Sequence, residues 1–144
     1  MLTALSRFAP PLALMALTFF LSAQPDLNSG LGDWDTVLRK GAHMIEFGLL
    51  WLLWWRALGY GHPGPAIAIA LAYAATDEWH QTFVARRHGS PLDWAIDAAG
   101  VGLAGLAVVW VIRSGRWTPR RPRRPAGGND RETTTAASPA PARR

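Results

Sequence analysis

Residues 65–84 constrain the fold of this chain most, because an apolar run is followed there by two adjacent acidic residues. Residues 65–76 are mainly Ala, Ile and Leu. That run is shorter than the roughly 20 residues that a membrane-spanning helix needs. A helix that continues to residue 84 is long enough, but it carries Asp77 and Glu78 into the bilayer. Charges there cost about 2.5 to 3.5 kcal/mol each, so they usually serve a function.

Four apolar segments predict an all-α fold, namely an integral membrane bundle of four transmembrane helices. The helices are expected at about residues 8–24, 37–58, 65–84 and 92–112, within one domain over residues 1–113. The first segment has an alternative interpretation as a cleaved signal peptide, with Arg7 before the apolar core and Leu21-Ser22-Ala23 as a weak cleavage site. The chain contains no Cys, which excludes disulfides and thiolate zinc sites.

Charge is distributed unevenly along the chain. Residues 1–112 carry six Lys and Arg and eight Asp and Glu, whereas residues 113–144 carry nine Arg and two acidic residues. The C-terminal part is also rich in Pro, Gly, Thr and Ala, so we expect residues 114–144 to form a disordered basic tail. It has no aromatic residue after Trp117 that would stack on bases, which argues against nucleic-acid binding.

Basic residues in short flanking segments predict the orientation, because they tend to stay in the cytoplasm. Arg7, Arg56 and the basic tail all lie on the cytoplasmic side if the N-terminus does. We therefore expect a multi-pass protein of the cell membrane with cytoplasmic N- and C-termini. Four basic residues then lie at the outer face, against the rule but near acidic residues: Arg39, Lys40, Arg86 and Arg87.

This topology brings polar residues from three predicted helices to the outer side of the membrane. Lys40, His43 and Glu46 are spaced by three residues, so they share one face of a helix. The third segment ends on that side, and the fourth begins there. These segments and their connecting loop contribute Asp77, Glu78, His80, Gln81, Arg86, Arg87, Ser90, Asp93 and Asp97. The sequence thus predicts one polar site at the extracytoplasmic face.

Each of these residues also has a simpler explanation. Lys40 can extend to the lipid headgroups, and His43 can be a buried hydrogen-bonding residue. The acids of the third segment can follow a helix that ends at Thr76. Asp93 can be a favourable acid in the first turn of a helix. The convergence of three segments favours a shared site over these separate explanations.

The same residues resemble the VanZ-like family of membrane proteins. The first motif is Lys40-x-x-His43-x-x-Glu46-Phe47. The second is Asp77-Glu78-x-x-Gln81-x-Phe83, followed by Arg87-x-x-Ser90-x-x-Asp93 and Gly100. The resemblance covers about residues 37–105 and implies a four-helix integral membrane protein. The members that gave the family its name are associated with low-level resistance to the glycopeptide teicoplanin.

The chain departs from the family pattern at three places. Arg39 stands where the family often has Asp, and Ala85-Arg86 stands where it often has Pro-Gly. Asp97 stands where Asn is common. These departures affect the expected ligand more than the expected fold.

The first functional hypothesis is a cell-envelope protein that binds an anionic lipid or a lipid-linked cell-wall precursor. Lys40, Arg86 and Arg87 supply the cations, and the planar fork of Arg suits phosphate. The predicted ligand-binding residues are Lys40, His43, Asp77, Glu78, Gln81, Arg87, Ser90, Asp93 and Asp97.

Two alternatives remain. One is a membrane enzyme that acts on a lipid phosphate by acid–base chemistry. Its candidate catalytic residues are His43, Glu46, Asp77, Glu78 and His80. The other is a polar network that only stabilises a small bundle. The sequence indicates no cofactor, no metal site and no particular oligomeric state.

Overall fold

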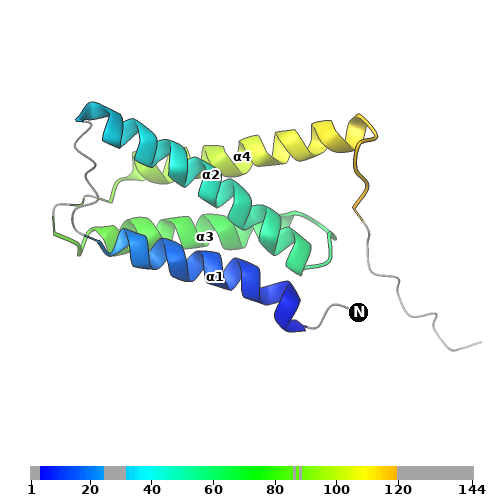
Figure 1. Cartoon of the computed structure of the whole chain (residues 1–144), viewed down its shortest axis with the longest axis horizontal. Coiled ribbons are helices and arrows are strands. Elements are labelled where there is room, and N and C mark those ends of the chain that lie inside the picture. Colours follow the sequence, from blue (N-terminus) through cyan, green and yellow to red (C-terminus); the bar gives the residue numbers. More distant parts are fainter. Residues whose placement is uncertain (1–3, 25–31, 86, 88, 120–144) are drawn as a thin grey trace, which may run out of the picture.

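The computed structural model describes residues 4–24, 32–85, 87 and 89–119. Within these residues the chain forms four helices, α1 (Ala4–Ser22), α2 (Asp33–Ala57), α3 (Gly64–Gln81) and α4 (Pro91–Arg113). Successive helices run in opposite directions, so α1 and α3 end where α2 and α4 begin (Figure 1). We call this the polar end of the bundle. The predicted all-α fold with four helices is confirmed.

The helix boundaries differ from the prediction mainly in α1 and α3. α1 begins at Ala4, four residues earlier than expected. The predicted third helix continued to residue 84, but α3 ends at Gln81. The amides of Thr82 and Phe83 donate to carbonyls three residues earlier, which tightens the chain into a turn. The polar groups of α3 therefore occupy its last turns and lie at the polar end.

Small residues let α2 approach its neighbours closely. α3 presents Ala66, Ala70 and Ala74, each with no exposed surface, to a core that includes Phe47 and Leu50 of α2. Their spacing of four residues puts all three alanines on one side of α3. Such stripes are typical of helix contacts in membranes.

The crossing of α2 and α4 is closer still. A Cβ atom on Gly100 of α4 would collide with the backbone carbonyl of Met44 in α2, and one on Gly48 would lie 3.0 Å from the Gly100 carbonyl oxygen. This crossing lies further into each helix than the pocket residues His43 of α2 and Asp97 of α4. It therefore sets how the polar residues of α2 face those of α4.

Aromatic side chains close the opposite end of the bundle. Trp51 and Trp55 are stacked with their ring centroids 5.6 Å apart. Trp117, which follows α4, packs edge-on against Trp55 and Tyr60 at 6.1 and 5.4 Å. Residues 120–144 of the predicted tail lie outside the described residues, so its disorder stays a prediction.

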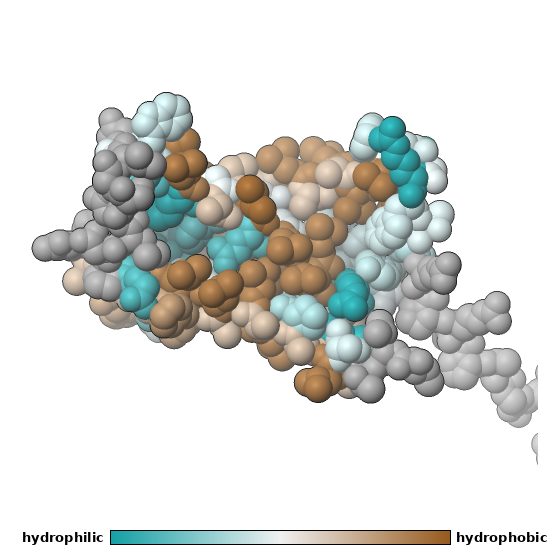
Figure 2. All heavy atoms as spheres, viewed as in Figure 1, coloured by the Kyte–Doolittle hydropathy of each residue, from teal (hydrophilic) through white to brown (hydrophobic). Residues whose placement is uncertain are grey.

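α1 and α4 are the helices, within the described ranges, that are long and apolar enough to cross a membrane. Only 11% of the most apolar stretch of α1 and 17% of that of α4 are buried within the bundle, unlike the core helices of a soluble protein. α2 is longer, but it includes Arg39, Lys40 and Glu46. α3 ends with four polar residues in its last turns. Apolar surface extends across the middle of the molecule (Figure 2).

Candidate functional site

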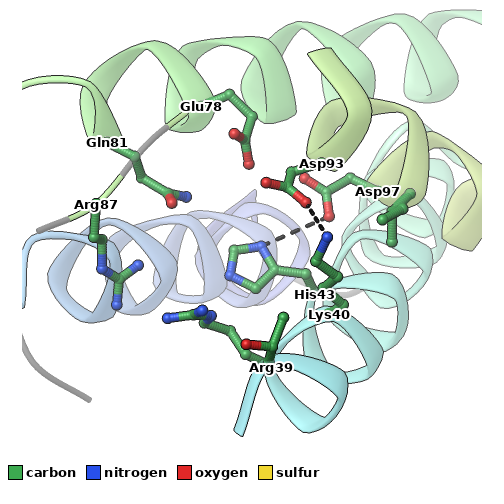
Figure 3. A pocket seen from close by; sticks show the side chains of 10 residues that line it. Arg39, Lys40, His43, Glu78, Gln81, Arg87, Asp93 and Asp97 are labelled. Carbon is green, nitrogen blue, oxygen red and sulfur yellow. Dashed lines mark ion pairs between the residues drawn. The ribbon is translucent and has the colours of Figure 1, made fainter. Parts of the chain in front are cut away.

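A polar cavity of about 260 Å³ opens at the polar end, between residues of α2, α3 and α4 (Figure 3). We call it the polar pocket. Its lining residues are Thr36, Arg39, Lys40, His43, Glu78, Gln81, Arg87, Asp93, Ile96 and Asp97. Seven of the nine predicted ligand-binding residues are in this set. The convergence that the sequence predicts is therefore a feature of the structure.

Two ion pairs connect α2 to α4 across the pocket. Lys40 Nζ lies 2.8 Å from Asp93 Oδ1, and His43 Nδ1 lies 3.6 Å from Asp97 Oδ1 (Figure 3). Each pair joins one helix to the other near the Gly48–Gly100 crossing. The first pair is about one third exposed, so it contributes little to stability by itself. Asp97 is almost fully buried and lies deeper in the pocket.

The start of α4 is fixed against α3 by Ser90. This residue caps the helix, because its Oγ accepts a hydrogen bond from the Asp93 amide at 3.1 Å. The same hydroxyl donates to Asp93 Oδ2 at 3.0 Å, and the Ser90 amide donates to Glu78 Oε2 at 2.9 Å. Gly89 lies so close to the Glu78 carbonyl that a Cβ atom would collide with it. Ser90 thus positions two pocket carboxylates without lining the pocket itself.

Arg87 closes the pocket from the loop between α3 and α4. Its Nη2 donates to the carbonyl of Leu21, in the last turn of α1, at 3.2 Å, and its Nε donates to the carbonyl of Gln24, just after the helix, at 3.0 Å. A cation at a helix C-terminus is favourable, because the carbonyls there are unpaired and carry partial negative charge. Burial lowers the pKa of the Arg87 guanidinium, and the charge of Arg39 lowers it further, whereas Asp77 and Glu78 raise it.

Asp77 lies behind the pocket, between α3 and α1. Its Oδ2 accepts hydrogen bonds from Ser22 Oγ at 3.0 Å and from Gln81 Nε2 at 2.8 Å. It is 1% exposed. Asp77 therefore holds Gln81 in position for the pocket and joins α1 to α3.

Two further predicted catalytic candidates lie outside the polar pocket. Glu46 accepts a hydrogen bond from the Thr18 hydroxyl of α1 and faces the space between α1 and α2. His80 is stacked on Phe19 of α1 with the ring centroids 4.3 Å apart. Arg86, which we expected to bind phosphate with Arg87, lies outside the described residues.

The sequence interpretation missed the contribution of α1 and the role of Arg39. Thr18 and Ser22 are four residues apart in an otherwise apolar segment, so they share a face, and each is 2% exposed. That spacing was the available signal for polar partners of α1. Arg39 was expected at the outer face but not among the ligand-binding residues, yet its side chain lines the polar pocket (Figure 3).

Arginines and carboxylates lie on different sides of the pocket. Figure 3 shows Arg39 and Arg87 on one side and the carboxylates of Glu78, Asp93 and Asp97 on the other. The two ion pairs use Lys40 and His43 and leave both arginines out. No group of three or more His, Asp and Glu side chains in the described part of the chain is arranged to hold a metal ion. The arrangement suits an anionic ligand that arginines contact.

Comparison with known proteins identifies the family of this chain. No curated protein and no solved structure matches the chain. Residues 8–113 match the VanZ/LLP1 family, and this range covers all four helices. The match, together with two long apolar helices, indicates a membrane protein. More than half of the chain lies within the match, so this protein belongs to the VanZ/LLP1 family.

Proposed function

We propose that this chain is a multi-pass membrane protein whose four helices all cross the bilayer, with both termini in the cytoplasm. The alternating helix directions support this. If α1 and α4 span the bilayer, then α2 and α3, which connect them and run alongside them, lie at the same depth in it. The basic residues at the end opposite the polar pocket support the orientation. There Arg7 Nη2 donates to the Ala57 carbonyl at 2.6 Å, and Arg56 Nη1 donates to the Ser6 carbonyl at 3.5 Å.

The polar pocket then opens at the extracytoplasmic face, at the depth of the lipid headgroups. We propose that it binds the phosphate of an anionic lipid or of a lipid-linked cell-wall precursor. One observation carries this proposal: Arg39 and Arg87 line the pocket, and neither belongs to its ion pairs. A guanidinium has five N–H donors, and among the described residues Arg87 uses two of them, on the carbonyls of Leu21 and Gln24. Further donors therefore remain for a phosphate.

A role in the cell envelope follows from this ligand class. A protein that holds wall precursors or anionic lipids at the outer face would affect the response to drugs that act there. Altered sensitivity to a glycopeptide such as teicoplanin is the cellular effect to measure. The biochemical role itself is accessory binding, without a chemical step.

Lipid selectivity in nanodiscs tests this function. The full chain is reconstituted in phosphatidylcholine, and phosphatidylglycerol is added in steps while bound lipid is counted by native mass spectrometry. We expect Arg39→Gln to weaken phosphatidylglycerol binding by about 10-fold or more, because a hydrogen bond to a charged group contributes roughly 1.5 to 3 kcal/mol. Equal binding of both lipids by the unmodified chain would rule out recognition of an anionic lipid, because phosphatidylcholine carries the same phosphate without a net charge.

One observation favours an enzyme as the second candidate. Asp97 Oδ1 lies 3.6 Å from His43 Nδ1, so a carboxylate and an imidazole are next to each other within the pocket. A His in this position is a suitable general base. Release of phosphate or alcohol from a lipid phosphate by the purified protein, abolished in His43→Gln, would establish this function. Binding without turnover would leave the accessory role.

A further inference from the structure

A second cavity lies beside the polar pocket, between α1 and α2. Its volume is about 320 Å³, and three of its lining residues, Arg39, His43 and Arg87, also line the polar pocket. We call it the α1–α2 cleft. Since the two cavities share these side chains, a molecule in the cleft meets the same cations as a molecule in the polar pocket.

The cleft exists because α1 and α2 diverge toward the polar end. Near the other end the two helices are in contact, with the rings of Phe8 and Trp54 6.2 Å apart. The hydrogen bond from Thr18 to Glu46 still joins them midway. Beyond it the cleft separates Leu21 of α1 from Leu38 of α2. Figure 1 shows this divergence, and Figure 2 shows hydrophilic residues in a hollow between the two helices on the same face.

The rim of the cleft is apolar and faces sideways. Leu21 and Leu38 line it and are 39% and 58% exposed. Neighbouring Phe20 and Val37 are also exposed. In the proposed topology these exposed apolar side chains face the bilayer. The cleft is thus bounded by side chains that suit hydrocarbon, and it has charged groups at its inner wall.

We infer that the α1–α2 cleft is a lateral entrance from the bilayer and that the ligand of the polar pocket is a membrane-borne amphiphile with a phosphate headgroup. The inference rests on the proposed function and specifies its ligand. The headgroup moves along the cleft to Arg39 and Arg87, while the chain remains between Leu21 and Leu38 and in the membrane. Lateral access is favourable because the acyl chain stays in apolar surroundings throughout. A lipid that enters from water must first lose the contacts of its acyl chain with other apolar groups.

A crosslink across the cleft tests the inference. Because the chain contains no Cys of its own, the crosslinker reacts only with cysteines that are introduced. The double variant Leu21→Cys/Leu38→Cys is bridged with a bismaleimide in nanodiscs. Ile45→Cys/Leu49→Cys, one helical turn apart on exposed positions of α2, is bridged as the matched control. Two ligands are compared: phosphatidylglycerol in the bilayer and glycerol phosphate in solution. Ala42→Phe, which narrows the cleft without a crosslink, is the second variant.

We expect the Leu21–Leu38 bridge and Ala42→Phe to lower phosphatidylglycerol binding at least about 10-fold, while glycerol phosphate binds as before and the control bridge has no effect. Undiminished phosphatidylglycerol binding by the bridged protein would overturn the lateral entrance and leave the proposed function intact. If the unmodified chain binds neither ligand, the proposed function fails, and the inference fails with it.

Discussion

At the scale of single residues, the buried carboxylates have different tasks. Asp77 has two hydrogen-bond donors, Ser22 and Gln81, and joins α1 to α3 away from the pocket. Asp97 pairs with His43 at the pocket itself. Both are 1% exposed, so burial alone does not distinguish them. Their partners predict that one substitution affects the fold and the other affects the ligand.

We predict that Asp77→Ala lowers the free energy of unfolding by about 1 to 3 kcal/mol, because Ser22 and Gln81 lose a shared buried acceptor. Asp97→Asn should leave stability within about 0.5 kcal/mol, since Asn keeps an acceptor for His43 and similar volume. Thermal unfolding in detergent measures both. A larger loss in Asp97→Asn than in Asp77→Ala would contradict these assignments.

The sequence predicted which residues meet but not all of their partners. Three-residue spacing put Lys40 and His43 on one face of α2, and the alternating topology put that face near Asp93 and Asp97. Whether Arg39 also reaches the pocket depends on the rotation of α2 about its axis. Spacing within one helix does not determine that rotation. It depends on which residues pack between helices, and here the Gly48–Gly100 contact decides it.

At the scale of elements, the close crossing of α2 and α4 builds the pocket. Gly100 has the Met44 backbone against it, whereas a Cβ atom on Gly102, two residues further along α4, would meet open space. The two glycines therefore form a matched pair. One is required by packing and the other is not.

We predict that Gly100→Ala destabilises the bundle by about 1 to 3 kcal/mol, because α2 and α4 must separate to accommodate the methyl group. The same variant should weaken ligand binding, since Lys40 and His43 move away from Asp93 and Asp97. Gly102→Ala is the control and should be neutral or slightly stabilising, as Ala favours a helix more than Gly does. Equal losses in thermal unfolding for both variants would contradict the role of the crossing.

Helix ends were predictable where the sequence has a strong signal. The fourth helix was expected from about residue 92, and α4 begins at Pro91 with Ser90 as its cap. α3 was predicted to reach residue 84 because a membrane span requires that length. It ends at Gln81 because the following amides form tight turns with carbonyls three residues earlier. Length requirements did not reveal this local hydrogen bonding.

For the whole molecule, a pocket at the outer face requires one orientation of the bundle in the membrane. Charge asymmetry in the sequence predicts the orientation, and the structure shows the shared polar end. Neither the family match nor the helix lengths determine which membrane face that end occupies. A direct topology experiment therefore belongs at this scale.

Reporter fusions after Gly59 and Gly115 should report the cytoplasm, and those after Gln24 and Gly89 the outside. The physical reason is that the basic residues Arg7 and Arg56 stay in the cytoplasm. Paired alkaline phosphatase and fluorescent protein fusions give opposite signals on the two sides. An outside signal after Gly59 would place the polar pocket in the cytoplasm and contradict the proposed site of action.

The C-terminal region gives a further prediction for the whole chain. Deleting residues 120–144 should leave membrane insertion and the polar pocket intact, because the four helices end at Arg113. The comparison measures inserted protein by membrane fractionation and ligand binding by lipid titration. Loss of inserted protein after the truncation would show that this basic segment is needed to orient or retain the bundle.

Arginines from two separate elements meet in one pocket, and we propose that together they bind a phosphate headgroup. Equilibrium binding of phosphatidylglycerol to two double variants tests it most directly. Arg39→Gln/Arg87→Gln removes the pocket arginines, and Arg113→Gln/Arg116→Gln removes the same charge at the opposite end. We predict a loss of about 100-fold for the first and less than about 2-fold for the second. Equal losses would mean that overall charge attracts the lipid and would contradict a specific pocket.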